Sequence, residues 1–395
     1  MTGAAVNTDH VYKNGKELRC GYTTGSCATA AAKQAVRILL GLPVTEGIGI
    51  MTPKGKALQL PAEVLLKEKD RVRCGVIKDA GDDADVTDGL MVCAEVRFPE
   101  RPEDGKGPEY EIDGGEGVGR VTRPGLDQPV GAAAINSVPR RMILEVLREA
   151  AEQAGYAGSL QVVISVPGGG EVAQRTFNPR LGIEGGISIL GTSGIVEPMS
   201  EQALIDTIRA EISMRTAEGA EALLMTPGNY GESFIRERMG LELENCVKCS
   251  NFIGEAVDLA AGFGVKDILL IGHIGKLVKV GSGIMNTHSR CADGRMETLS
   301  SCVLLAGGDA DTAREILRCN TTEDALLFLR EKACYDKAME ILAERVETAL
   351  SHHVYDRIRI GAVLFSMQSG LCLIGKKAEE MFEDGIFCRG RLGSA

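Results

Sequence analysis

Residues able to bind an anion precede the first predicted helix. The segment GYTTGSC at 21–27 places two glycines and three hydroxyl residues, Thr23, Thr24 and Ser26, before an alanine-rich run. Hydroxyl side chains cap the free amides of a helix start, where the helix dipole also favours negative charge. The segment therefore predicts either a well-capped packing helix, which local chemistry alone favours, or an anion pocket.

Five aspartates crowd the segment KDAGDDADVTDG at 78–89. Counted from Asp83, Asp88 and Ala94 occupy the positions where a calcium loop needs Gly and Glu, so a calcium loop is excluded. Clustered carboxylates need a cation, a proton or full solvation. The segment is predicted to be either a solvated turn or, through Asp82 and Asp83, a site that orients a substrate or moves a proton.

Histidine and arginine side chains complete the candidate groups. His273 follows the apolar segment LLIG, and His288 lies in GIMNTHSRCADGR. Each is either structural or part of a site at a strand end. Arginine geometry favours bidentate binding of carboxylates, with surface solvation as the alternative. The arginines in question are Arg120, Arg123, Arg140 and Arg141.

Three further motifs fail as cofactor or metal sites. GGEGVGR at 114–120 is followed by VTRPGL, which cannot open a helix, so it is not a dinucleotide loop. GHIGKLV lacks the spacing of a phosphate loop and has Leu277 where a magnesium-binding hydroxyl is needed. The pair Cys246 and Cys249 has no second pair at metal spacing, so buried thiols are predicted.

Composition excludes several classes of protein. The chain has 395 residues, 44% of them hydrophobic, which predicts two or three domains. A net charge of −11 argues against a nucleic-acid binder that relies on global charge. Twelve cysteines without framework spacing, no signal peptide and no apolar run of membrane length predict a soluble, cytoplasmic protein with reduced thiols.

The first part of the chain predicts an α+β domain with a mainly antiparallel sheet. A helix is expected at about 26–41, and short strands follow within 47–98 without intervening helices. An amphipathic helix at 137–155 ends at Gly155 and is expected to mark the domain boundary. The first domain is therefore expected to span residues 1–155.

The remainder, residues 156–395, predicts an α/β domain with a parallel, Rossmann-like sheet and a helical C-terminal part. Short apolar strands each end in a glycine-rich turn that leads into a helix. Ligands of such sheets bind beyond the carboxyl ends of the strands. The turns expected there contain Gly168, Gly169, Gly191, Thr192, Ser193, Gly194, Gly228, Asn229, Tyr230, Gly231 and Gly272.

Taken together, these motifs resemble the CbiD family, the cobalt-precorrin-5B C1-methyltransferases of anaerobic cobalamin biosynthesis. The resemblance is carried by GYTTGSCATAAAK, KDAGDDADVTDG, GGEGVGRVTRPGL, TFNPRLGIEGGISILGTSGIVEPMS and GHIGKLVK…GIMNTHSRCADGRME. It implies S-adenosylmethionine as methyl donor and a cobalt-containing tetrapyrrole as substrate. It also implies an α+β domain followed by a Rossmann-like one. The chain departs from the family at Asp88 and Gly170, where His and Glu are common.

The resemblance implies a role for each group of candidate residues. Because the substrate carries many carboxylates, the hydroxyls at 23–26, the arginines and His288 are expected to bind it. The glycine turns are expected to bind the donor, and Asp82, Asp83 and His273 to steer proton loss. Cobalt arrives with the substrate, so no protein metal site is expected. The two domains are expected to form opposite walls of one cleft, in a possible homo-oligomer. A non-catalytic tetrapyrrole carrier is the alternative.

Overall fold

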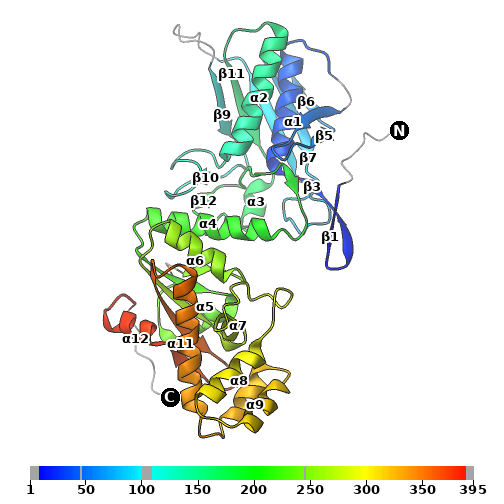
Figure 1. The fold of residues 1–395 in the computed structure, drawn as a ribbon. Coiled ribbons are helices and arrows are strands. Elements are labelled where there is room, and N and C mark those ends of the chain that lie inside the picture. Colours follow the sequence, from blue (N-terminus) through cyan, green and yellow to red (C-terminus); the bar gives the residue numbers. More distant parts are fainter. Residues whose placement is uncertain (1–8, 45–46, 100–108, 244–245, 388–395) are drawn as a thin grey trace. The chain divides into compact units, whose positions relative to one another are not determined.

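The computed structural model describes residues 9–44, 47–99, 109–243 and 246–387. The chain divides into two compact units, residues 1–203 and 204–395 (Figure 1). Antiparallel pairing dominates the sheets of the first unit, and parallel pairing dominates the sheet of the second. None of the described helices is both long and apolar enough to cross a membrane.

The first unit is built on a five-stranded sheet in the order β6-β7-β8-β11-β9. All its pairings are antiparallel except that of β11 with β9. The strands are β6 (Glu63–Lys67), β7 (Arg71–Ile77), β8 (Met91–Arg97), β9 (Tyr110–Gly114) and β11 (Leu160–Ser165).

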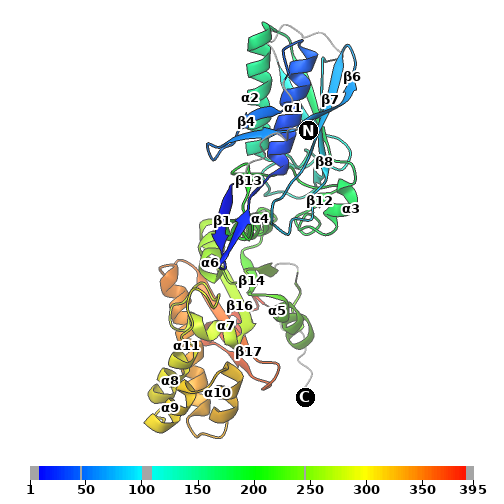
Figure 2. The same ribbon diagram turned by 90° about the vertical axis from the view of Figure 1, so that its right-hand side faces the viewer.

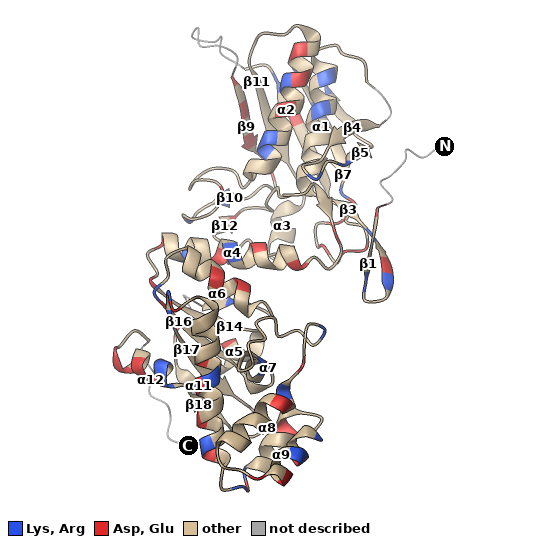
Figure 3. Cartoon of the chain, viewed as in Figure 1, with Lys and Arg blue, Asp and Glu red and all other residues tan. Residues whose placement is uncertain are grey.

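Helices α1 (Thr24–Leu39) and α2 (Ser137–Ala154) lie side by side over this sheet (Figures 1 and 2). The alanines of α1 are fully buried, because small side chains let the helix approach β7 and β8 closely. Basic and acidic residues are interspersed along α2 (Figure 3). This helix therefore lacks the continuous basic stripe that a nucleic-acid-binding helix needs.

Short two-stranded ladders complete the first unit. Their partners are β1 (His10–Lys13) with β2 (Lys16–Arg19), β4 (Ile48–Met51) with β5 (Ala57–Leu60), β3 (Gly21–Tyr22) with β13 (Ile195–Val196), and β10 (Arg120–Val121) with β12 (Ile183–Glu184). The short helix α3 (Gly169–Ala173) follows β11. Pro61 separates β5 from β6, because proline has no N–H to donate to a ladder.

The expected domain boundary at 155/156 is wrong. Strand β11, predicted to open the parallel sheet, pairs with β8 and β9 inside the first unit. The segment 186–190, also expected as a parallel strand, makes only single bridges, from Ile187 to Val118 and from Ile189 to Ile135. Since β13 then pairs with β3, the first unit continues to residue 203.

The second unit contains a five-stranded sheet in the order β15-β14-β16-β17-β18, in which only β18 is antiparallel. The parallel sheet is thus confirmed, with a later start than expected. The strands are β14 (Ala222–Thr226), β15 (Cys246–Lys248), β16 (Asp267–His273), β17 (Arg359–Phe365) and β18 (Cys372–Ile374).

Alternate residues of these strands enter two different cores, so helices cover both faces of the sheet. Leu223, Ile268 and Ala362 pack on one side with α6 (Ile253–Gly262), α7 (Ile274–Val280), α8 (Arg295–Leu305), α10 (Thr322–Leu329) and α11 (Tyr335–His353). Leu224 and Leu269 pack on the other with α5 (Asn229–Phe234), the π-helix η1 (Ile235–Met239) and α12 (Lys376–Glu383). Helices α4 (Glu201–Ala217) and α9 (Ala310–Leu317) are the remaining ones.

A buried carboxylate holds the start of α12. Glu347 of α11 accepts hydrogen bonds from the backbone N–H groups of Ala362, Lys377 and Ala378, at 3.1, 3.0 and 3.1 Å. Burial raises the pKa of Glu347, while these amides oppose the rise. Glu347 therefore caps a helix that is distant in sequence and ties it to β17.

Candidate functional site

The start of α1 is a capped, closed helix end. Thr23 is the N-cap, and its Oγ1 accepts a 3.2 Å hydrogen bond from the backbone N–H of Ser26. Oγ1 of Thr24 accepts one of 2.9 Å from the Leu190 N–H, and Oγ of Ser26 donates one of 2.7 Å to the Gly194 carbonyl. Because these hydroxyls are bonded within the first unit, the helix start has the contacts of a packing helix, and binding of a substrate carboxylate there stays a prediction.

The turn at 191–194 was expected at the parallel sheet but lies in the first unit, against α1. A Cβ atom on Gly191, where φ is +144°, would sit 2.2 Å from Oγ1 of Thr23. Oγ of Ser193 bonds to the backbone of Ile195, and Thr192 is exposed. Glycine at 191 thus serves close packing; the expected location of this turn at the parallel sheet is wrong, and its contact with the donor stays a prediction.

Gly168 and Gly169 are likewise in the first unit, at the start of α3. A Cβ atom on Gly169 would lie 2.3 Å from the carbonyl oxygen of Gly117, and one on Gly186 would lie equally close to the same atom. Three backbone segments meet there with no room for side chains. This close approach explains Gly169, while a φ of +79° explains Gly168; both lie in the first unit and not at the parallel sheet.

The acidic segment 78–89 is a hydrogen-bonded turn. Each of its aspartates has a hydrogen-bonding partner in the fold: Asp79 with the Arg19 guanidinium (2.6 and 2.8 Å), Asp82 with the Arg19 N–H (2.6 Å), Asp83 with the Met199 N–H (3.0 Å), Asp85 with Lys78 (2.6 Å) and Asp88 with the Ala80 N–H (2.8 Å). The hydrogen bond from Arg19 lowers the pKa of Asp79. The turn is therefore neither merely solvated nor a free cluster of carboxylates.

The arginines of the first unit divide into two kinds. Arg120 forms a bidentate pair with Asp113, at 2.8 and 2.9 Å, and remains partly exposed. Arg140 is half-buried and donates to the carbonyls of Ile135 and Ile112, at 2.9 and 3.0 Å. Burial lowers the pKa of Arg140. Arg140 therefore braces the backbone.

Two further arginines reach toward the surface of the first unit. Arg141 is exposed on α2, one residue beyond Arg140. Arg123 is also exposed, and its aliphatic stem packs where a Cβ atom on Gly182 would lie, 2.5 Å from Cγ. The exposed guanidinium of Arg141 can bind a carboxylate ligand.

In the second unit, the carboxyl ends of β14 and β16 meet at a topological switch point. The chain passes from β14 to β15 on one side and then to β16 on the other side of β14. Ligands of open α/β sheets bind in the crevice that such a reversal creates. The turn after β14 and His273 at the end of β16 lie at this edge.

The turn at 228–231 combines open space with close packing. Nothing lies within 4 Å of a Cβ atom placed on Gly228, whereas one on Gly231 would lie 1.6 Å from Oγ1 of Thr226. Oδ1 of Asn229 accepts a 2.9 Å hydrogen bond from Lys248, and Tyr230 is 78% exposed. Gly231 therefore lets α5 approach β14, and Tyr230 offers an open aromatic face to a ligand.

His273 caps α7 and has both ring nitrogens engaged. Nδ1 accepts a 3.1 Å hydrogen bond from the Gly275 N–H, and Nε2 lies 3.4 Å from Oε1 of Glu323. The ring meets that of Phe365 edge-on, with centroids 5.7 Å apart. Burial lowers the pKa of His273, and Glu323 opposes the shift. The imidazole is therefore neutral at pH 7, with its proton on Nε2 toward Glu323.

Lys276 and Glu323 belong to this edge and were missed by sequence reasoning. Nζ of Lys276 donates a 2.9 Å hydrogen bond to the Pro227 carbonyl, and burial lowers its pKa. The sequence signal for Lys276 was its position in GHIGKLV, a motif that was excluded as a phosphate loop and not considered further. Glu323 lies in a segment that reads only as a capped helix. Gly272 packs under α7, since its Cβ atom would lie 3.0 Å from Cγ of Leu277.

His288 lies in the second unit, in a loop bonded to the turn after β15. The Thr287 N–H donates a 2.9 Å hydrogen bond to the Asn251 carbonyl. His288 itself is exposed, and its Nδ1 accepts from the Arg290 N–H at 3.1 Å. It is therefore in a different unit from the arginines with which it was grouped. Among the described residues, no group of three or more His, Cys, Asp and Glu side chains could hold a metal ion.

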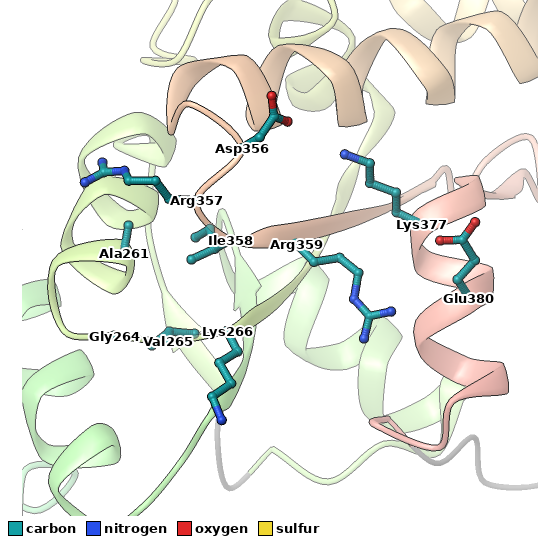
Figure 4. A pocket seen from close by; sticks show the side chains of 10 residues that line it. All are labelled: Ala261, Gly264, Val265, Lys266, Asp356, Arg357, Ile358, Arg359, Lys377 and Glu380. Carbon is teal, nitrogen blue, oxygen red and sulfur yellow. The ribbon is translucent and has the colours of Figure 1, made fainter.

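A cavity of about 480 Å³ lies at the opposite edge of the parallel sheet (Figure 4). Lys266 and Ile358, which line it, directly precede β16 and β17. Its Arg359 is paired with Asp267 and Asp384, at 2.6 and 2.7 Å. The cavity is thus at the amino ends of the strands, away from His273. The guanidinium of Arg359 in its lining is already paired with two carboxylates.

Comparison with known proteins settles the family. The model of the family described as CbiD matches residues 11–198, and that described as CbiD, C-terminal domain, matches residues 286–374. The chain belongs to the CbiD family. The first CbiD segment lies within the first unit, and the second contains His288, Glu323 and β17.

Relatives match almost the whole chain. The cobalt-precorrin-5B C(1)-methyltransferase of Ruminiclostridium cellulolyticum is 48% identical over 91% of each chain. Those of Alkaliphilus metalliredigens and Photorhabdus laumondii are 44% and 42% identical, over 95% and 96% of this chain and 97% and 98% of theirs. The crystal structure of a cobalamin biosynthesis protein (CbiD) from Archaeoglobus fulgidus is 27% identical, covers 71% of this chain and 86% of that chain, and has a TM-score of 0.38.

Proposed function

We propose that this chain is a cobalt-precorrin-5B C1-methyltransferase that uses S-adenosylmethionine as methyl donor. The observation that carries the proposal is 48% identity to a relative of that name over 91% of both chains. The paired family segments at 11–198 and 286–374 support it, because they span both units. No observation favours a non-catalytic tetrapyrrole carrier.

The proposed donor site is the carboxyl edge of the parallel sheet. We take the second unit to be Rossmann-like, and the strand order β15-β14-β16-β17 with helices on both faces supports this. The open backbone at Gly228 and the exposed ring of Tyr230 fit an adenosine group. Lys276 is proposed to supply positive charge for a carboxylate, whereas Lys248 is paired with Glu232 at 2.7 Å. The residues proposed to contact the donor are Gly228, Asn229, Tyr230, Gly231, Gly272 and Lys276.

The proposed reaction requires no nucleophilic side chain from the protein. When bound, the donor supplies a methyl group on a sulfonium, which is already activated for attack by an electron-rich ring carbon. Cys249, directly after β15, is a poor nucleophile, since burial raises its pKa to about 12. The side chains must therefore position the reactants in line and exclude water. His273, neutral and held by two partners, is proposed to order this edge, and it accepts a proton only if its Gly275 contact opens.

The carboxylates of the tetrapyrrole are proposed to bind the exposed arginines of the first unit. Arg141 and Arg123 are exposed there, and Arg120 would have to exchange its partner Asp113 for a substrate carboxylate. Arg140 is proposed to brace the backbone instead, because two of its N–H groups donate to the carbonyls of Ile135 and Ile112. The hydroxyls of Thr23, Thr24 and Ser26 are proposed to support the fold. Asp82 and Asp83 are proposed to hold the acidic turn.

Calorimetric titration of the purified chain with S-adenosylhomocysteine, with ATP as the control ligand, tests the donor. Incubation with S-adenosylmethionine and cobalt-precorrin-5B then tests turnover, by the mass gain of one methyl group. Donor binding together with methyl transfer supports the proposal. Tetrapyrrole binding without donor binding would instead support the carrier.

A further inference from the structure

Beside His273 lies a group of polar side chains that the function proposed above does not use. Oε1 of Glu323 accepts a 2.6 Å hydrogen bond from Oγ of Ser366, and the same Oγ accepts one of 3.1 Å from the Ser369 N–H. Thr322 precedes Glu323 in the first turn of α10, and its Oγ1 would lie 3.8 Å from a Cβ atom on Gly275. The groups come from α10 and from the turn after β17, at the carboxyl edge of the sheet.

Three atoms of this group are buried and have no hydrogen-bond partner among the described residues: Oγ1 of Thr322, Oε2 of Glu323 and Oγ of Ser369. Thr322 is 3% exposed and Ser369 is 5% exposed. The other such atoms in the described chain are Gln34 Oε1 on α1 and Arg215 Nε on α4. Unpartnered buried polar atoms destabilise a fold, a carboxylate oxygen most of all. Thr322 and Glu323 are consecutive, and Ser369 is joined to Glu323 through Ser366, so the three residues form one group that points to a molecule bonding their free atoms.

The chemistry of the atoms selects the ligand. Glu323 offers only acceptor capacity while ionised, whereas the Thr322 and Ser369 hydroxyls can both donate and accept. An ammonium group supplies donors alone and leaves those hydroxyl hydrogens without an acceptor. A pair of neighbouring sugar hydroxyls supplies both. The group therefore suits a diol better than a cation.

We infer that Thr322, Glu323, Ser366 and Ser369, here called the Glu323 pocket, bind the ribose hydroxyls of the methyl donor; this rests on the proposed function. His273 is the outer member of the site, with a side chain 35% exposed against 15% for Glu323. Its 3.4 Å contact to Glu323 is longer than a well-formed hydrogen bond. A ribose hydroxyl displaces the imidazole from Glu323 and takes its place on the carboxylate.

The test combines thermal unfolding of the ligand-free chain with titration by S-adenosylhomocysteine. The variants are Thr322→Val, Ser369→Ala and Glu323→Gln, and Glu331→Gln, an exposed neighbour beyond α10, is the matched control. We expect the first two variants to unfold at or above the wild-type temperature, because each loses an unpartnered atom. Affinity should fall about three- to tenfold in these two and about tenfold or more in Glu323→Gln, where a charged acceptor is lost. The control should change neither quantity.

Analogues of the ligand sharpen the test. Wild type should bind 2′-deoxy- and 3′-deoxy-S-adenosylhomocysteine more weakly than the parent, and Glu323→Gln should discriminate less. Wild-type affinity in all three variants would overturn the inference. So would lower unfolding temperatures with unchanged affinity, which describe a buried water. If wild type binds no S-adenosylhomocysteine, the proposed function itself falls, a failure seen before any variant is compared.

Discussion

Nε2 of His273 lies 3.4 Å from Oε1 of Glu323, joining the end of β16 to the first turn of α10. Nδ1 of the same ring accepts the Gly275 N–H, so the imidazole is a helix cap as well as a partner of the carboxylate. Burial lowers the pKa of His273 below its ordinary 6.5. The ring is thus built into the edge in its neutral form.

This arrangement predicts a loss of stability in mild acid. Since the folded pKa lies below the unfolded one, the contribution of His273 is present above pH 6.5 and is lost as the pH falls through the folded value. His273→Asn keeps a cap for Gly275 and removes the titration. Its unfolding temperature should therefore fall less than that of wild type between pH 7 and pH 5. Parallel pH profiles for the two proteins would contradict the assignment.

Gly228 and Gly231, three positions apart, should respond oppositely. Gly231→Ala should destabilise the chain by about 1–3 kcal/mol, because the added Cβ meets Oγ1 of Thr226 at 1.6 Å. Gly228→Val should leave stability nearly unchanged and weaken S-adenosylhomocysteine binding, because the space beside it is open. Denaturation curves and calorimetry measure the two effects. Unchanged donor affinity in a folded Gly228→Val chain would remove this turn from the site.

Removal of the Glu347 carboxylate should be costly. Glu347→Ala leaves three N–H groups, two of them buried, without an acceptor, so a loss of about 3 kcal/mol or more is expected. Glu347→Gln retains one acceptor oxygen and should lose less. Urea denaturation of both variants gives the comparison. A Glu347→Ala change within about 0.5 kcal/mol would show that water replaces the carboxylate.

The acidic turn should tolerate loss of charge unevenly. Asp82→Asn and Asp83→Asn keep an oxygen for the N–H groups of Arg19 and Met199, so stability and methyl transfer should both hold. Asp79→Asn breaks the bidentate pair with Arg19 and should cost about 1 kcal/mol, since the pair is partly exposed. A large drop in turnover for Asp82→Asn or Asp83→Asn, with donor affinity intact, would restore the proton-moving role.

Two adjacent arginines separate substrate binding from stability. Arg141→Ala should leave the fold intact and weaken tetrapyrrole affinity by up to about tenfold at low salt, and by less at high salt. Arg140→Ala should instead lower the unfolding temperature, because the Ile135 and Ile112 carbonyls lose their donor. Equal tetrapyrrole affinity for Arg141→Ala and wild type at both salts would place the substrate elsewhere.

The sequence predicted the class of each sheet better than the division between the units. Strand β11 reads as a buried apolar run, and such a run looks alike in an antiparallel and a parallel sheet. The pairing of β11 with β8 depends on contacts far apart in sequence, which no local pattern carries. The predicted boundary therefore lies too early in the chain. The parallel strands after residue 221 follow the expected order of strand, turn and helix.

Glycine turns were the main source of error at the site. Gly169 and Gly191 are small because a backbone or a hydroxyl passes within 2.3 Å of the missing Cβ, whereas a Cβ atom on Gly228 would meet nothing within 4 Å. Sequence alone cannot tell close packing from room for a ligand. Glu323 escaped notice for another reason: its segment has a capping box, so the pattern is fully explained as a helix start.

The pairing of β3 with β13 bears on the order in which the chain can fold as it is synthesised. Tyr22 pairs with Ile195, and Ser26 donates to Gly194, so the start of α1 acquires its final partners only after residue 196 has left the ribosome. Contacts of such long sequence separation form slowly. A nascent chain that ends near residue 155 has the helix and most of the sheet but lacks the segment that closes them. During synthesis, the first unit should therefore complete its folding late, at about the time that α4 begins to leave the ribosome.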